Sequence, residues 1–200
     1  MRPLFALSIV MLGTVLFACD NKGDPEKPKN PTGDPAASAS PHASTSPASI
    51  ARLGFPGTEE GAKALLQGFL KPGASRSEMS KSLKPSDADY DAIFDTDVAT
   101  KAKAAYAEHW NNEDSILEAE EGQTELLLWK ATTEQFRDGS GDVSEFPSGY
   151  KKVADKLKPG LTFYRFKFVK PENKHGATYD GLVFVNGHWV MVSKPYRVVE

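Results

Sequence analysis

The sequence predicts an α+β fold, with helices in the first half of the folded region and strands in the second. Apolar residues recur every three or four positions up to about Trp110, which is the period of amphipathic helices. After Thr124, alternating aromatic and β-branched residues and one Asn-Gly pair are typical of antiparallel strands. Helices followed by strands favour separate layers over a sheet of alternating strands and helices.

Three capping signals predict where the shorter helices begin. Thr58 is expected to cap a helix that ends before Pro72-Gly73. Ser75 with Glu78 has the three-residue spacing of a capping box before a short turn, and Ser86 with Asp89 repeats this signal.

A longer helix is expected from about Asp97 to Trp110. One face of it carries Val98, Ala102, Ala105 and His109 at spacings of four, three and four, and this face is expected to turn toward the core.

The second half is expected to form a sheet from segments 124–131, 161–170 and 182–192. Asn186-Gly187 predicts a two-residue hairpin turn, which pairs Phe184 with Trp189 and Leu182 with Met191. Both faces of this hairpin are apolar, so we expect it to be central in the sheet and covered on both sides.

N-terminal helices packed on a curved antiparallel sheet that ends in a β-hairpin resemble the cone-shaped fold of the nuclear-transport-factor-2-like superfamily. The resemblance covers roughly residues 55–200 in element order and size. It implies a pocket between the long helix and the concave sheet, which members use for catalysis, for binding or as a scaffold. A fold does not choose among these uses.

The amino terminus has the features of a secretory signal. Arg2 precedes an apolar run from Leu4 to Phe17, which is shorter than the roughly 20 residues of a membrane span. The segment Leu16-Phe17-Ala18-Cys19 resembles the lipobox of bacterial lipoproteins. An ordinary cleaved signal with an incidental cysteine is the alternative.

The lipobox resemblance implies that residues 1–18 are a signal peptide and that Cys19 carries acyl chains, such as palmitate, on its sulfur and amine. These chains would anchor the protein in the bacterial cell envelope with its domain facing the periplasm. Asp20 retains lipoproteins in the inner membrane in some lineages only, so the choice between inner and outer membrane stays open.

Residues 19–54 are expected to be a disordered tether, and residues 55–200 a single α+β domain. The tether is rich in proline, serine and alanine and has almost no apolar residue before Ile50, so it cannot bury enough surface to offset its chain entropy.

Charge divides the domain into two parts. Residues 55–149 contain 9 basic and 19 acidic side chains, whereas residues 150–200 contain 10 and 4. We interpret this as attraction between acidic helices and basic strands within one domain, with a docking patch as the alternative. The net charge of −3 argues against a nucleic-acid partner.

The sequence contains no motif for a metal or a cofactor, and none is expected. Its four histidines never occur at metal-ligand spacing. The candidate pocket residues are aromatic or ionisable side chains of the long helix and the strands: Tyr106, His109, Trp110, Tyr164 and Asp180.

Two functions fit these residues. The favoured hypothesis is a tethered domain that binds a protein partner or a small apolar ligand without catalysis. The alternative is a pocket enzyme of the isomerase or hydrolase type, with His109 beside Asp114 as general base. For His109 itself, a hydrogen-bonded core residue is the more common role.

Overall fold

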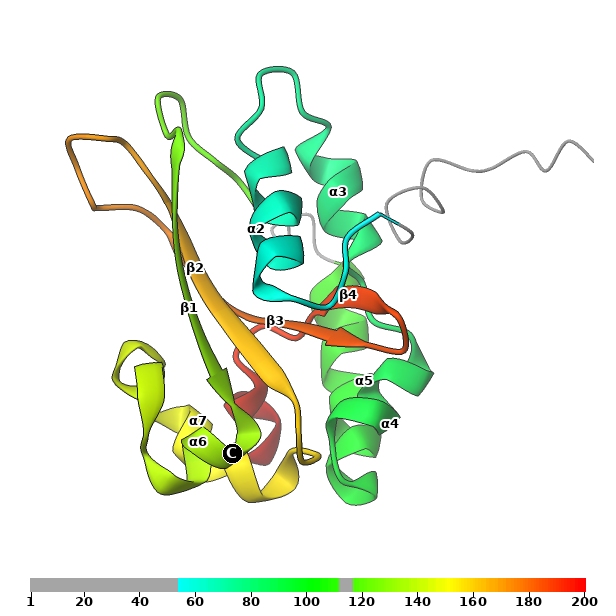
Figure 1. Ribbon diagram of the computed structural model, residues 1–200. Coiled ribbons are helices and arrows are strands. Elements are labelled where there is room, and N and C mark those ends of the chain that lie inside the picture. Colours follow the sequence, from blue (N-terminus) through cyan, green and yellow to red (C-terminus); the bar gives the residue numbers. More distant parts are fainter. Residues whose placement is uncertain (1–53, 112–116) are drawn as a thin grey trace, which may run out of the picture. The chain divides into compact units, whose positions relative to one another are not determined.

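The computed structural model describes residues 54–111 and 117–200 and confirms the α+β fold (Figure 1). Cys19, the signal peptide and almost all of the tether lie outside the described residues, as does Asp114. The expectations for those segments therefore stay predictions.

Within the described residues, four helices precede the sheet: α2 (Glu59–Gly68), α3 (Arg76–Ser82), α4 (Asp87–Ile93) and α5 (Thr96–Asn111). Thr58 caps α2, because its Oγ1 accepts a hydrogen bond from the Gly61 N–H at 3.2 Å. At α4, Asp89 Oδ2 accepts from the Ser86 N–H at 2.7 Å, as a capping box requires. The box predicted at Ser75 is wrong, since this side chain makes no cap bond.

The sheet contains four antiparallel strands in chain order: β1 (Glu125–Thr132), β2 (Thr162–Val169), β3 (Thr178–Val185) and β4 (His188–Met191). Four short helices connect β1 to β2: α6 (Thr133–Asp138), η2 (Gly141–Glu145), α7 (Gly149–Val153) and η3 (Ala154–Lys156). A last turn, η4 (Pro195–Val199), follows β4. In Figure 1, α2 and α3 lie near one end of the sheet and α6 and α7 near the other.

Two apolar cores lie on opposite faces of the sheet. On one face, Phe166 and Phe168 pack with Leu66 of α2, and we call this the α2 core. On the other, Phe163 and Val183 pack with α5 and α7, and we call this the α5 core. Side chains alternate between the faces along a strand, so the alternating aromatics of β2 supply both cores.

The turn between β3 and β4 consists of Asn186 and Gly187, with φ of 50° and 80°. Phe184 pairs with Trp189 across the two strands. Both faces of the hairpin are buried, as expected. The expected central position is wrong for β4, because this strand forms an edge of the sheet. The Met191 N–H donates to the Leu83 carbonyl at 2.9 Å, which satisfies part of that edge.

A β-bulge at Gly181 reverses the direction of the side chains at the start of β3 relative to the two faces of the sheet. Tyr164 pairs with Leu182 and Arg165 with Asp180, so Gly181 is the extra residue. Its φ of +97° belongs to the left-handed region that favours glycine. Because of the bulge, Asp180 shares a face with Arg165 and faces away from the α2 core.

The buried stripe of α5 differs from the predicted one. Val98, Ala102 and Tyr106 are buried, whereas Ala105 and His109 are exposed. The helix is thus rotated relative to the expected face, and the role of a packed core residue is excluded for His109. Ala105 and His109 border a pocket instead.

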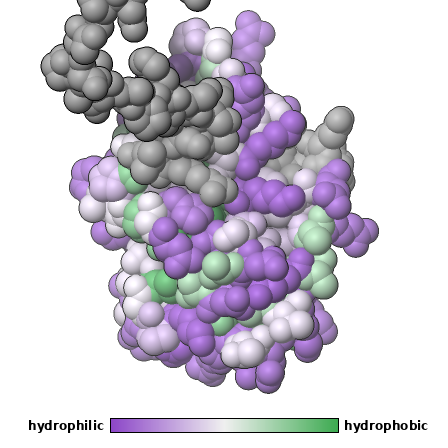
Figure 2. Space-filling model, turned by 90° about the vertical axis from the view of Figure 1, so that its right-hand side faces the viewer, coloured by the Kyte–Doolittle hydropathy of each residue, from purple (hydrophilic) through white to green (hydrophobic). Residues whose placement is uncertain are grey.

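The surface shown in Figure 2 is mostly hydrophilic, with apolar residues in small separate patches. Within residues 54–111 and 117–200, no helix is long and apolar enough to span a bilayer.

Candidate functional site

A pocket of about 450 Å³ lies between the second half of α5, the start of β3 and the chain segment around η4. It forms because β3 extends beyond its partner. Val185 to Leu182 pair with β4, while Thr178 and Asp180 pair with β2 alone. The pocket occupies the space beside this unpaired edge.

Asp180 forms the polar floor of the pocket and is only 6 % exposed. Its Oδ1 accepts hydrogen bonds from the Tyr150 hydroxyl at 2.9 Å and from the Lys194 N–H at 3.1 Å. Tyr150 is completely buried, and burial together with the Asp180 charge raises its pKa well above the ordinary value. The Tyr150 hydroxyl therefore stays a hydrogen-bond donor to the carboxylate at every physiological pH.

The segment that enters η4 forms one wall and is held in place from two sides. The Tyr106 hydroxyl donates to the Ser193 carbonyl at 2.8 Å, and the next N–H, that of Lys194, binds Asp180. Lys194 adopts a left-handed conformation with φ of 53°. Such a conformation is costly outside glycine and persists where surrounding contacts fix it.

His109 lies at the exposed rim of the pocket. Its ring makes edge contacts with Tyr106 and Trp110, with centroids 6.1 and 5.8 Å apart. Partial burial, and then the positive charge of Lys194, lower its pKa below the ordinary 6.5. The imidazole is therefore mainly neutral at neutral pH.

Of the five predicted site residues, the structure brings three together in this pocket: Tyr106, His109 and Asp180. Trp110 packs between the two cores and does not line the pocket. Tyr164 does not line this pocket as expected. It lies in the α2 core on the other face of the sheet, with its ring centroid 5.5 Å from that of Trp189.

Among the lining residues that the sequence reasoning missed are the pocket's two cations, Lys194 and Arg197. They follow the last strand in a stretch without hydrophobic periodicity. The only available signal was the excess of basic residues after Tyr150.

A second polar cluster connects α4 to the hairpin turn. The Asp89 carboxylate is fully buried and binds Ser86, Asn186 Nδ2 at 2.8 Å and His188 Nε2 at 3.1 Å. Burial alone would raise the Asp89 pKa, but the hydrogen bonds from Ser86 and Asn186 and the charge of His188 hold it below the ordinary value. The His188 side chain is only 13 % exposed, so this histidine is part of the buried cluster although it lies next to the hairpin turn.

Among the described residues, no group of three or more His, Cys, Asp or Glu side chains is arranged to hold a metal ion.

Comparison with known proteins places the chain in no family: no protein-family model, curated protein or solved structure matches it. The likeness to lipoproteins and to the nuclear-transport-factor-2-like superfamily therefore stays a prediction from the sequence.

Proposed function

We propose that this chain is a lipid-anchored protein of the bacterial cell envelope whose domain binds a small ligand without catalysing a reaction. The lipid anchor is supported by the sequence Leu16 to Cys19. The ligand site is the pocket beside Thr178 and Asp180.

The observation that carries the proposal is the combination of size and lining in this pocket. A volume of about 450 Å³ falls within the range of sites that enclose small organic ligands. Ala105, Leu117 and Val198 provide apolar contacts, whereas Thr178 and Ser193 add polar groups. Apolar side chains cover the body of a ligand, and convergent polar groups orient it.

The proposal is tested with N-phenyl-1-naphthylamine, a neutral dye that fluoresces in apolar surroundings. The chain from residue 19 onward carrying Cys19→Ser has neither acyl chains nor the apolar run Leu4–Phe17, so no membrane or signal segment takes up the dye. We expect saturable binding at one site. Ala105→Trp should abolish it, because this exposed residue borders the pocket.

Ala107→Trp is the matched control, since Ala107 is exposed on the same helix but does not line the pocket. Equal binding by both variants, or no binding by the parent chain, would contradict a ligand site in this pocket.

The lipid anchor is tested by Cys19→Ser in the natural host. We expect the protein to leave the membrane fraction and to lose the mass of its acyl chains, since two or three chains are needed for firm anchoring. Unchanged fractionation and mass would refute acylation at Cys19.

An enzyme that uses His109 as general base is the second candidate. It is favoured by the neutral imidazole at the pocket rim, because a base must be unprotonated at working pH. Loss of turnover in His109→Gln, with dye binding retained, would establish it over the binding function.

A further inference from the structure

We propose that the pocket selects organic anions: molecules with an apolar body and a carboxylate, sulfonate or phosphate group. This inference rests on the proposed function, since it names the ligand class of the same pocket.

Two exposed cationic side chains, Lys194 and Arg197, lie at the mouth of the pocket. Among the described residues, neither takes part in an ion pair with a protein carboxylate. Six of the seven ion pairs of the described residues use a Lys or Arg elsewhere on the domain, and none uses these two cations. Their charges are free to attract a ligand.

Among the described residues, Asp180 is the one carboxylate that lines the pocket, and two hydrogen bonds stabilise its charge. Its Oδ1 accepts from Tyr150 and from the Lys194 N–H. Arg165 pairs with it directly across the strands, on the same face of the sheet. Among the described residues that line the pocket, the two cations Lys194 and Arg197 outnumber this single carboxylate.

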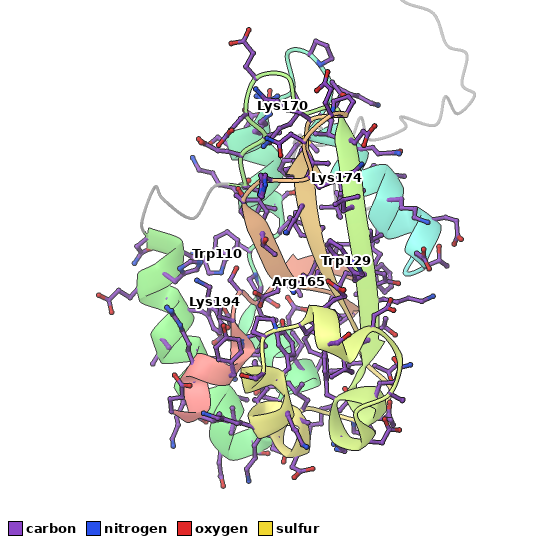
Figure 3. The ribbon with its side chains drawn as sticks, turned by 90° about the vertical axis from the view of Figure 1, so that its left-hand side faces the viewer. Trp110, Trp129, Arg165, Lys170, Lys174 and Lys194 are labelled. Carbon is purple, nitrogen blue, oxygen red and sulfur yellow. The ribbon has the colours of Figure 1, made fainter. Side chains whose placement is uncertain are left out.

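Arg165 also carries a buried Nε that has no hydrogen-bond partner within the described residues. Buried N–H donors are normally paired, so this one marks a missing acceptor across the strands from Asp180, although Arg165 itself does not line the pocket. Figure 3 shows Arg165 on β2 and Lys194 ahead of η4 on this side of the sheet.

The positive charge acts on neighbouring groups in the expected direction. Lys194 lowers the pKa of His109, and Arg197 opposes the rise that burial gives to the pKa of Tyr106. The effect at His109 reports a positive potential at the exposed rim, whereas at Tyr106 the charge of Asp180 raises the pKa and Arg197 acts against it.

The apolar part of the ligand would rest against Tyr106, Leu117 and Val198. A simple inorganic anion would leave this surface uncovered. The lining therefore favours an amphipathic anion over phosphate or sulfate alone.

The test compares two dyes of similar shape on the Cys19→Ser chain: anionic 1-anilinonaphthalene-8-sulfonate and neutral N-phenyl-1-naphthylamine. We expect the anionic dye to bind more tightly, and its advantage to shrink as salt screens the exposed charges. Near-ultraviolet circular dichroism verifies that each sample is folded.

The double variant Lys194→Gln/Arg197→Gln should weaken binding of the anionic dye about fivefold or more, because it removes two exposed charge contacts. Binding of the neutral dye should weaken by much less than binding of the anionic dye. Lys71→Gln/Lys81→Gln is the matched control, since it removes the same charge at exposed residues of the α2–α3 region.

Octanoate and octanol, which share an apolar chain, identify the group that is recognised. Displacement of the anionic dye by octanoate at much lower concentration than by octanol supports a soluble anion. Co-sedimentation with phosphatidylglycerol vesicles, absent with phosphatidylcholine vesicles and lost in Ala105→Trp, supports an anionic lipid headgroup.

Equal affinity for both dyes, or equal weakening by the two double variants, would overturn the preference for anions. The pocket would then still be a ligand site. Failure of both dyes to bind would refute the proposed function itself.

Discussion

The hydrogen bond between Tyr150 and Asp180 should be one of the most costly single interactions to remove from this domain. Tyr150 is completely buried, and its hydroxyl donates to Asp180 Oδ1 at 2.9 Å. A hydrogen bond to a charged group contributes about 1.5 to 3 kcal/mol, and its loss leaves a buried carboxylate short of a donor. Tyr150→Phe removes only this hydroxyl, so it isolates the bond.

We expect Tyr150→Phe to lower the free energy of unfolding by about 2 kcal/mol. In a domain of this size, that loss shifts the thermal midpoint by about 4 to 8 °C. Urea denaturation followed by tryptophan fluorescence measures the free energy directly, and an unchanged slope would show that the unfolded state is the same.

Tyr179→Phe is the control, because the Tyr179 hydroxyl bonds to the Glu118 carbonyl at 3.1 Å in an exposed position. It should cost less than about 1 kcal/mol. In an Asp180→Asn background, Tyr150→Phe should also cost less, since the charged acceptor is gone. Equal costs for Tyr150→Phe and Tyr179→Phe in the parent chain would refute the view that the Tyr150–Asp180 bond stabilises the pocket floor.

Three further changes probe other parts of the structure. The pKa of Asp89 is lowered in the fold, so its carboxylate stabilises the fold above the ordinary pKa of 3.8, and this contribution is lost as the pH falls below that value. Thermal midpoints measured from pH 6 to pH 2 should therefore fall steeply for the parent chain and less steeply for Asp89→Asn. Gly181→Ala places a side chain at a φ of +97° and its methyl group against the Val192 carbonyl, so it should lower the free energy of unfolding by about 2 to 3 kcal/mol. A loss below about 1 kcal/mol in urea denaturation would contradict the bulge geometry. His109→Gln changes an exposed residue, so the unfolding free energy should stay within about 0.5 kcal/mol of the parent, whereas a loss of 2 kcal/mol would restore the core role that the structure excludes.

Local patterns in the sequence predicted the elements of this fold well. Thr58 caps its helix as expected, and the segments 124–131 and 161–170 agree closely with β1 and β2. These features depend on neighbours within a few residues, which is the range that periodicity and capping report.

The pocket was predictable only in part, because it depends on how elements meet. The bulge at Gly181 moves Asp180 to the pocket side, and a strict alternation along the strand cannot show this. Tyr164 obeys the alternation and therefore lies on the opposite face. Lys194 enters the pocket through a left-handed turn that carries no sequence signal of its own.

The burial of His109 was predicted incorrectly for a similar reason. A helical face can be assigned from spacing, but its rotation about the axis depends on the packing partners. Tyr106 is buried and bonds to the Ser193 carbonyl, and with this rotation of the helix His109 lies at the rim of the pocket.

The most direct test of the ligand site is a titration of the ¹⁵N-labelled Cys19→Ser chain with N-phenyl-1-naphthylamine, followed by the shifts of its backbone amides. We predict that the largest changes occur at Tyr106, Asp180 and Lys194, which surround the pocket. Changes concentrated at Tyr164 and Trp189, on the other face of the sheet, would contradict the assignment of the ligand site to this pocket.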